Sequence, residues 1–275
     1  MKTTVTTLLK MKASGEKISM LTCYDYTMAR LMDEAKIECL LVGDSLGQVV
    51  LGYETPLSVT LDDMIHHAKA VVRGAKQAFV VVDMPFMTYQ VNAEQALVNA
   101  GRLIQETGAQ AVKLEGGEKV APQIAAIVSA GIPVVAHIGL TPQSVHQLGG
   151  YKVQGKTQAA AQQLLDDARA VEAAGACAVV LECVPAALAA KVSERLSVPT
   201  IGIGAGAGCD GQVLVWQDML GMFKDFQPKF VKQFAQVGDT MQEAFARFRQ
   251  EVREGSFPEA VHSFTIDEDV LSRLY

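Results

Sequence analysis

Short, almost continuously hydrophobic runs recur along the chain, and longer amphipathic stretches separate them. Such runs are typical of parallel strands buried on both faces, and their alternation with helices indicates βαβ units. Eight runs occur, at residues 18–24, 39–43, 79–83, 111–115, 133–137, 178–182, 200–203 and 212–215. The pattern therefore predicts eight parallel strands with seven crossovers, closed into one (β/α)8 TIM barrel of the α/β class.

Capping residues mark several of the helices between these runs. Thr60, which precedes an acidic pair, and Asn92, which heads an Asn-Ala-Glu-Gln run, are placed to begin helices. Gly108, Gly131 and Gly175 stand where helices are expected to stop.

Four segments lie outside this alternation. Residues 1–17 precede the first strand, and residues 262–275 form a tail that we expect to act as a contact arm. Residues 138–157, rich in glycine, read as a long loop over the end of strand five, where loops often contribute to a site. Residues 230–254 have a helical pattern that predicts a helix covering the barrel or meeting a neighbouring subunit. No linker divides residues 1–275, which are expected to form one catalytic domain.

Length and composition fit such a domain. The chain has 275 residues, of which 49% are hydrophobic, and a (β/α)8 barrel takes about 250 residues. The formal net charge of −6 argues against a nucleic-acid groove, because phosphate binding relies on clustered lysine and arginine. The expected partners are therefore small molecules and further copies of the chain.

Neither secretion nor a membrane is indicated. Residues 1–14 lack the apolar core of a signal peptide, and no stretch reaches the ~18 apolar residues that a membrane helix needs. The five cysteines are scattered and include no CxxC pair, which favours buried thiols in a reducing compartment over disulfides or a zinc site. We therefore expect a cytoplasmic protein.

Polar residues stand at the carboxyl ends of five consecutive predicted strands, the second to the sixth. They are Asp44, Asp83, Lys113 with Glu115, His137 and Glu182. Active sites of (β/α)8 barrels form at this end, where the loops converge. Because residues two apart on a strand share a face, Lys113 and Glu115 are expected to point the same way.

The carboxylates of this set predict a metal site. Asp44 or Asp83 taken alone is equally well explained as a helix N-cap. Together with Glu115 and Glu182, they bring like charges to one barrel mouth, and a cation or protons must relieve that repulsion. A ligand set made only of oxygens favours Mg²⁺ or a similar hard ion over zinc.

A divalent ion here could activate a small 2-oxo acid. Chelation through the carboxylate and keto oxygens would make the proton on the adjacent carbon removable. Glu182 is the candidate base, because the metal carboxylates belong to strands two to four. Lys113 would face the substrate carboxylate or the enolate oxygen, unless it forms only a structural ion pair. His137 is either a donor to the substrate or a hydrogen-bonded residue of the barrel wall.

A glycine-rich run, residues 202–208, follows predicted strand seven. A dinucleotide-binding fingerprint belongs to an early βαβ unit with an acidic residue ~20 positions further on, so a phosphate-binding or positive-φ loop is the better interpretation. His66 and His67 fall within a helical pattern and are expected to be surface or packing residues.

Seven motifs follow one another in a recognisable order. They are GDSLG at 43–47, LGYETPL at 51–57, VDMPF at 82–86, VKLEGG at 112–117, HIGLTPQS at 137–144, LECVP at 181–185 and IGIGAG at 201–206. Together they resemble the ketopantoate hydroxymethyltransferase family over residues 18–264, while residues 265–275 fall outside the shared motifs.

This resemblance implies a Mg²⁺-dependent barrel of pantothenate biosynthesis. Such an enzyme transfers a hydroxymethyl group from 5,10-methylenetetrahydrofolate to 3-methyl-2-oxobutanoate and gives 2-dehydropantoate. The resemblance implies Asp44, Asp83 and Glu115 as metal ligands, and Glu182 as the proton acceptor that forms a Mg²⁺-stabilised enolate. The implied substrate contacts are Asp44, Ser45, Asp83 and Lys113. Members of the family form decamers, so a homodecamer is implied as well.

Two alternatives remain open at this point. A metal-dependent lyase of the isocitrate lyase or phosphoenolpyruvate mutase kind would also combine carboxylates with Mg²⁺, but its KKCGH-type motif is missing from the sequence. A non-catalytic oligomeric scaffold would keep the barrel without the chemistry, and the complete set of four carboxylates argues against it.

Overall fold

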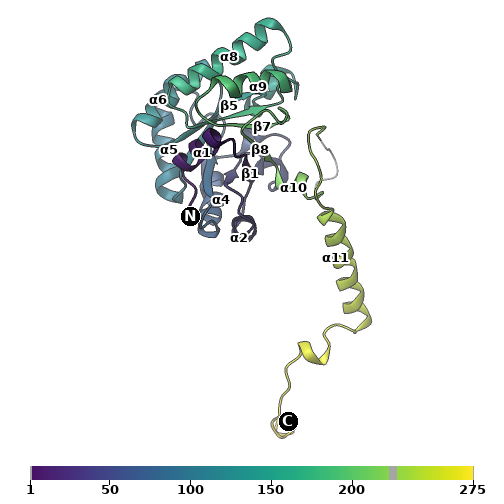
Figure 1. The fold of residues 1–275 in the computed structure, drawn as a ribbon. Coiled ribbons are helices and arrows are strands. Elements are labelled where there is room, and N and C mark those ends of the chain that lie inside the picture. Colours follow the sequence, from purple (N-terminus) through teal and green to yellow (C-terminus); the bar gives the residue numbers. More distant parts are fainter. Residues whose placement is uncertain (1, 223–227, 275) are drawn as a thin grey trace.

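The structure is a computed structural model that describes residues 2–222 and 228–274. Its centre is a closed barrel of eight parallel strands in sequence order, with the last strand pairing back onto the first (Figure 1). The strands are β1 Ile18–Thr22, β2 Cys39–Val42, β3 Phe79–Asp83, β4 Ala111–Glu115, β5 Val134–Gly139, β6 Ala178–Glu182, β7 Thr200–Ile203 and β8 Gly211–Leu214. The predicted single-domain (β/α)8 barrel is confirmed.

Helices connect most of the strands. The longer ones are α1 Val5–Ser14, α2 Tyr26–Glu34, α4 Leu61–Gly74, α5 Ala93–Thr107, α6 Ala121–Ser129, α8 Gln158–Ala173, α9 Ala186–Arg195 and α11 Val237–Glu254. Short turns of helix are α3 Leu46–Val49, η1 Pro56–Ser58, η2 Glu118–Val120, η3 Pro142–Ser144, α7 Val145–Leu148, α10 Trp216–Met219, η4 Ala260–His262 and α12 Glu268–Leu271.

The predicted helix signals are confirmed. The Thr60 side chain accepts from the Asp63 backbone N–H, and the Asp63 carboxylate accepts from the Thr60 N–H, which makes a capping box at the start of α4. The Asn92 side chain caps α5 by accepting from the Gln95 backbone N–H at 2.8 Å, and Gly108 ends the helix in the left-handed region at φ 78°. The two histidines in α4 are packing or surface residues as predicted, and His67 Nδ1 lies 2.7 Å from the Tyr24 carbonyl oxygen.

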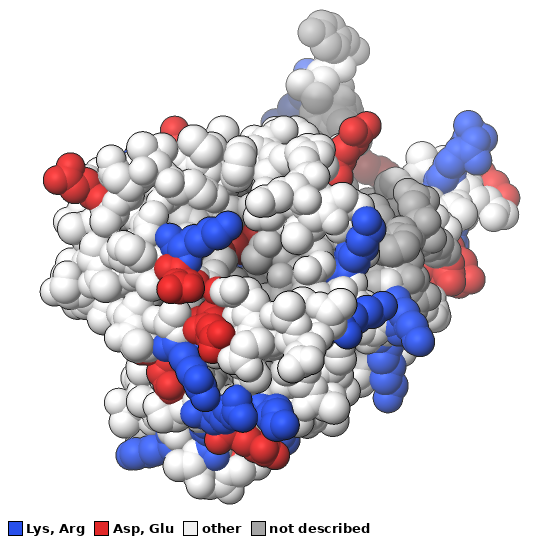
Figure 2. Space-filling model, turned by 90° about the horizontal axis from the view of Figure 1, so that it is seen from above, with Lys and Arg blue, Asp and Glu red and all other residues white. Residues whose placement is uncertain are grey.

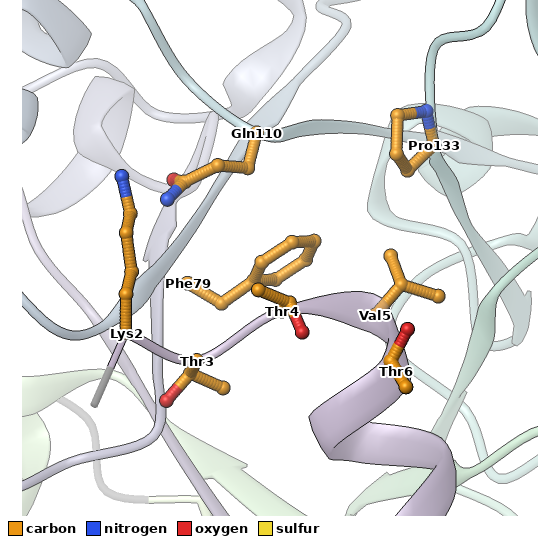
Figure 3. A pocket seen from close by; sticks show the side chains of 8 residues that line it. All are labelled: Lys2, Thr3, Thr4, Val5, Thr6, Phe79, Gln110 and Pro133. Carbon is orange, nitrogen blue, oxygen red and sulfur yellow. The ribbon is translucent and has the colours of Figure 1, made fainter.

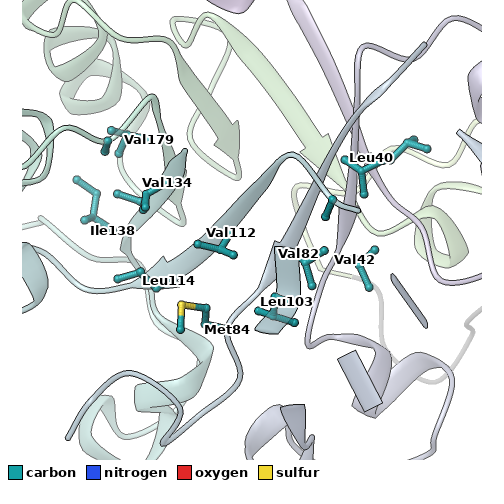
Figure 4. Close-up of a cluster of buried hydrophobic side chains, with 14 of the residues drawn as sticks. Leu40, Val42, Val82, Met84, Leu103, Val112, Leu114, Val134, Ile138 and Val179 are labelled. Atoms are coloured by element: carbon teal, nitrogen blue, oxygen red, sulfur yellow. The ribbon is translucent and has the colours of Figure 1, made fainter. Parts of the chain in front are cut away.

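Two hydrophobic layers line the barrel wall, because successive strand residues point to opposite faces. Outward-facing residues such as Val82, Val112 and Val134 form one cluster with residues of the surrounding helices (Figure 4). Inward-facing residues such as Val81 and Val135 form a second cluster inside the barrel. The barrel interior is therefore a packed core below its carboxyl end.

Helix α1 closes the amino-terminal end of the barrel. Its buried residues Leu8 and Met11 join the interior cluster. The sequence pattern predicts no element in residues 1–17, because only these two apolar side chains are buried on a short polar helix.

Three predictions of local structure were wrong in part. The connection between β7 and β8, residues 204–210, contains no helix, so the last crossover is a loop. Residues 138–157 are not one loop, because β5 extends to Gly139 and η3 and α7 follow. The last long helix begins at Val237 rather than at residue 230.

Helix α11 does not cover the barrel, which was one of its two predicted roles. It projects away from the barrel and leads to the C-terminal tail (Figure 1), and none of its residues is buried. Its apolar residues Phe245 and Phe248 are 63% and 58% exposed. β8, which closes the barrel by pairing with β1, ends well before α11 in the sequence. The barrel therefore closes without α11.

The surface and the thiols agree with the composition. On the face seen in Figure 2, lysines and arginines are interspersed with aspartates and glutamates, and neither sign dominates. Four cysteines are buried and Cys183 is half-buried, and all five thiols are free. None of the helices in the described part of the chain has the length and apolar character required to cross a bilayer.

Candidate active site

The barrel interior changes from apolar to charged towards the carboxyl ends of the strands. On β3 the inward column passes from Phe79 and Val81 to Asp83, and on β4 it ends in Lys113 and Glu115. The register places Asp83 beside Lys113 and Glu115 beside His137. Glu182 ends the inward column of β6. The predicted residues of strands three to six are thus brought together at one barrel mouth.

Asp44 joins this group from the turn after β2. Its backbone N–H donates to Asp83 Oδ2 at 3.0 Å, and its side chain is buried. The next residue, Ser45, lies at the edge of the group with its Oγ 2.9 Å from the Tyr24 hydroxyl. Neither Asp44 nor Asp83 caps a helix, since α3 follows Ser45 and α5 is capped by Asn92. The N-cap interpretation of the two aspartates is therefore wrong.

Lys113 supplies the positive charge at the centre of the site. Its Nζ lies 2.9 Å from Asp83 Oδ1, and both side chains are almost fully buried. Burial by itself lowers the pKa of Lys113, but the negative charges of Asp83, Glu115 and Asp44 outweigh that effect and raise it. The ammonium group is thus held charged, as the predicted contact with an anionic substrate requires.

The pKa values of the two buried aspartates, Asp44 and Asp83, are raised. Burial raises the pKa of Asp44 well above its usual range, the charges of Asp83 and Glu115 raise it further, and Lys113 and Gln143 lower it. Burial likewise raises the pKa of Asp83, against the charge of Lys113. Excess negative charge at this mouth is the condition that a bound cation relieves.

His137 bridges two carboxylates across the mouth. Its Nε2 lies 3.2 Å from Glu182 Oε2, and its Nδ1 lies 3.4 Å from Glu115 Oε1 and 3.3 Å from Lys113 Nζ. Burial and the Lys113 charge lower the pKa of His137, but its bonds to Glu115 and Glu182 prevail and raise it to about 9. His137 therefore lies in contact with two carboxylates of the group, and its role as a donor to the substrate stays a prediction.

Glu182 differs from the other carboxylates in its access. Its side chain is 15% exposed, whereas those of Asp83, Lys113, Glu115 and His137 are 3–5% exposed. The following residue, Cys183, takes a positive φ of 48°, a conformation rare for residues with a Cβ and frequent near functional sites. Among these carboxylates, Glu182 is the most open to an incoming molecule.

Two residues that the sequence analysis did not single out complete the network. Gln143, in η3, donates from Nε2 to Asp44 Oδ2 at 2.8 Å and from its backbone N–H to Glu115 Oε2 at 2.9 Å. Tyr89 donates its hydroxyl to Gln143 Oε1 at 2.7 Å and accepts from the Glu115 N–H at 3.1 Å. The available signal was the position of Gln143 in the segment expected to contribute to the site, and nothing in the sequence distinguished Tyr89.

Two of the carboxylates, Asp44 and Asp83, fit a hard divalent cation. In residues 2–222 and 228–274, no three His, Cys, Asp or Glu side chains are arranged to hold a metal ion. Both oxygens of Glu115 are engaged by Gln143 and His137. Asp83 Oδ1, in contrast, is buried without an aligned hydrogen-bond donor, although Lys113 is close. Asp44 and Asp83 suffice in number, because Mg²⁺ is commonly held by one or two carboxylates together with substrate and water.

A cavity beside α1 and the glycine-rich loop after β7 offer no such chemistry. A cavity of about 420 Å³ lies at the opposite end of the barrel, beside the start of α1, and its lining contains no carboxylate (Figure 3). The glycines at 202–208 are explained by conformation and packing. Gly204 and Gly206 have positive φ, and a Cβ on Gly208 would lie 2.6 Å from the Ala190 Cβ. The positive-φ interpretation of this loop is confirmed for those two glycines.

Solved structures similar to this chain have the same barrel. A phosphonopyruvate hydrolase in complex with oxalate and Mg²⁺ matches with a TM-score of 0.62 and 13% identity, over 98% of this chain and 94% of that one. A 2,3-dimethylmalate lyase matches with a TM-score of 0.61 and 17% identity, over 99% and 94%. At such low identity these similarities concern the fold alone.

Sequence relatives are much closer. A 3-methyl-2-oxobutanoate hydroxymethyltransferase of Clostridium novyi is 62% identical over 275 residues, which is 100% of both chains. Its counterpart in Enterococcus faecalis is 59% identical over the same length. The family model described as ketopantoate hydroxymethyltransferase matches residues 2–260. The chain therefore belongs to the ketopantoate hydroxymethyltransferase family and is a hydroxymethyltransferase enzyme.

Proposed function

We propose that the enzyme transfers a hydroxymethyl group from 5,10-methylenetetrahydrofolate to 3-methyl-2-oxobutanoate and forms 2-dehydropantoate, a step of pantothenate biosynthesis. The observation that carries this proposal is the meeting of Asp44, Asp83, Lys113 and Glu182 at one barrel mouth. Family membership supports the choice of substrates, because the closely related proteins carry the name of this activity.

Asp44 and Asp83 would hold Mg²⁺, with Glu115 as the third carboxylate of the proposed set. The ion would supply Lewis-acid polarisation of the substrate's 2-oxo group, which acidifies the proton on C3. The buried Asp83 Oδ1 and the raised pKa of Asp44 support this assignment. The carboxylate of the substrate would meet Lys113 and Ser45, beside the same two aspartates.

Glu182 is the proposed general base. It is the most accessible carboxylate of this group, and its Oε2 lies 3.2 Å from His137 Nε2, a contact that orients the carboxylate. After Glu182 takes the proton from C3, Lys113 would stabilise the negative charge on the enolate oxygen. Such charge stabilisation is usually the largest contribution to rate.

The transfer itself joins two carbons. C3 of the enolate forms a bond to the methylene carbon of the folate, both carbon–nitrogen bonds of that carbon break, and water supplies the hydroxyl oxygen of the product and a proton for one of the two nitrogens. Glu182, protonated in the first step, is placed to return its proton to the other nitrogen. No described aromatic residue identifies the folate-binding surface.

We further propose a cytoplasmic homo-oligomer, with a decamer as in the family. The exposed apolar side of α11, which includes Phe245 and Phe248, supports burial against another copy of the chain.

Proton exchange tests the base directly. In deuterated water, 3-methyl-2-oxobutanoate with enzyme and Mg²⁺ but without folate should exchange its C3 proton. We expect Glu182→Gln to lose exchange while it still binds the substrate, and Glu172→Gln, at a distant carboxylate near Ser197, to retain it. Exchange at the normal rate in Glu182→Gln would show that another group is the base.

Metal and substrate tests address the remainder of the proposal. Chelation of divalent ions should abolish exchange, and added Mg²⁺ should restore it. Turnover that persists after complete chelation would exclude the metal role. Cleavage of a hydroxy diacid or of phosphonopyruvate would instead favour a lyase reaction, and folate-dependent formation of 2-dehydropantoate would exclude that alternative.

A further inference from the structure

The amide of Gln143 has all four of its hydrogen-bonding positions filled. Nε2 donates to Asp44 Oδ2 at 2.8 Å and to the Met84 carbonyl oxygen at 3.0 Å. Oε1 accepts from the Tyr89 hydroxyl at 2.7 Å and from Gln90 Nε2 at 3.1 Å. A glutamine side chain has two donors and one carbonyl oxygen with two lone pairs, so this side chain has no free capacity.

These neighbours permit only one orientation of the amide. If the group were turned over, its oxygen would face the oxygens of Asp44 and Met84, and its NH₂ would face the Gln90 NH₂. The structure thus aims a fixed pair of donors at the Asp44 carboxylate. Gln143 is itself buried, so water does not compete for these contacts.

The backbone of Gln143 holds a second carboxylate. Its N–H donates to Glu115 Oε2 at 2.9 Å, and Tyr89, which binds the Gln143 side chain, also contacts the backbone of Glu115. One residue after β5 therefore orients Asp44 after β2 and Glu115 at the end of β4. None of the roles proposed above is assigned to it.

We propose that Gln143 is a positioning residue that fixes the Asp44 carboxylate in the orientation in which it binds a divalent cation. This inference rests on the proposed function, because it takes Asp44 as a cation ligand. Groups that orient metal ligands from outside the coordination sphere commonly contribute about 10- to 100-fold to metal affinity. The amide also connects the segment after β5 to the cation site, so order in that segment and cation affinity depend on each other.

Side-chain replacements separate this role from the backbone contact, which every variant retains. Gln143→Met keeps the length of the side chain and removes the donors to Asp44. Gln143→Glu keeps the shape and places an oxygen against Asp44 Oδ2. Gln147→Met and Gln147→Glu are matched controls, because Gln147 is exposed in α7, four positions further along the same segment.

The experiment is calorimetric titration of Mg²⁺ alone into the full-length enzyme and these variants, with thermal unfolding measured on the same samples. We expect the dissociation constant of Mg²⁺ to rise about 10- to 100-fold in Gln143→Met, and to rise further in Gln143→Glu. The Gln147 variants should stay within about twofold of the starting enzyme. The number of sites per folded chain should not change.

Several outcomes would overturn the inference. A normal Mg²⁺ dissociation constant in Gln143→Met would do so, and so would a lower number of sites with an unchanged constant, which is the sign of a merely structural role. Should Gln143→Met fail to fold, Gln143→Asn, whose amide is one methylene shorter, takes its place with the same expectation and the same refutation.

The variant Asp44→Asn separates the proposed metal role of Asp44 from the proposed positioning role of Gln143. If Asp44→Asn binds Mg²⁺ normally, the proposed metal role of Asp44 fails, and the role of Gln143 fails with it. If Asp44→Asn loses Mg²⁺ while Gln143→Met binds it normally, only the role of Gln143 is refuted.

Discussion

Replacement of Lys113 by methionine tests the charge balance of the barrel mouth. Methionine approximates the length of lysine without its charge, so the packing inside the barrel is largely kept. The change leaves Asp83, whose Oδ1 lies 2.9 Å from the Lys113 Nζ, buried without its counter-charge. It also leaves Asp44 and Glu115 without the positive charge that opposes their mutual repulsion.

The size of the effect follows from this geometry. Two unit charges 2.9 Å apart attract by about 6 kcal/mol at an effective dielectric constant of about 20. Desolvation offsets part of that attraction, and removal of one partner of a buried pair typically costs about 3–5 kcal/mol. For a barrel of this size we expect a melting temperature lower by about 6–20 °C.

The loss should depend on pH in a defined direction. Because burial raises the pKa of Asp44 and Asp83, the folded state binds more protons than the unfolded state above the ordinary aspartate pKa of 3.8. Loss of Lys113 raises these pKa values further. The stability of Lys113→Met relative to the original enzyme should therefore recover as the pH falls towards that value.

Urea unfolding of both proteins without Mg²⁺, at neutral and at mildly acidic pH, measures these effects. Lys69→Met is the control, because Lys69 lies 3.6 Å from Glu106 in an exposed pair and such pairs contribute about 0–1 kcal/mol. A loss in Lys113→Met no larger than in Lys69→Met, or one that grows in acid, would refute the account of the charged mouth.

Three further predictions concern other parts of the molecule. Because the pKa of His137 is raised from 6.5 to about 9, the stability that His137 contributes should be complete below pH 6.5 and disappear as the pH rises through 9. The difference in unfolding free energy between His137→Phe and the original enzyme should therefore shrink over this range. A difference that stays constant with pH would contradict this prediction. If α11 joins copies of the chain as proposed, Phe245→Asp with Phe248→Asp should lower the sedimenting mass, whereas Gln250→Asp on the same exposed helix should not. An unchanged mass in the double variant would contradict the proposed burial of α11 against another copy. Gly208→Ala should cost about 1–3 kcal/mol of stability, because its Cβ would lie 2.6 Å from Ala190. Gly101→Ala, which has open space around it, should gain up to about 1 kcal/mol in its helix. Thermal melts that rank the two variants in the opposite order would show that the loop around Gly208 rearranges to accept the methyl group.

The strands and the inward direction of the site residues could be predicted from the sequence, because both follow from local pattern. The bounds of β3, β4, β6 and β7 are confirmed residue for residue, since each strand is an almost continuous hydrophobic run that ends in a polar group or glycine turn. Because Lys113 and Glu115 are two residues apart on one strand, the sequence predicts that both side chains point the same way, and both lie inside the barrel.

Contacts between distant segments were beyond such reasoning. Gln143 reaches Asp44 across 99 positions of sequence, and its role depends on the shape of the turn at η3, which no periodic pattern encodes. The pattern of α11 indicated a helix with an apolar side, but its amphipathic period is the same whether that side meets the barrel or another chain. The sequence pattern did not reveal helix α1, because its two buried side chains are covered only by packing against the end of the barrel.

The change from apolar to charged side chains inside the barrel has a consequence for how activity can be altered. Val81 lies two residues below Asp83, and Val135 two below His137, so a distance of about 6.6 Å along the strand separates each supporting side chain from its charged neighbour. A larger or smaller residue at such a position shifts the wall that carries the charged group, while the group itself stays chemically intact. A random screen for altered turnover should therefore recover substitutions among the inward-facing valines below the mouth, alongside those at the mouth. Kinetic phenotype is then a poor guide to which residues touch the substrate.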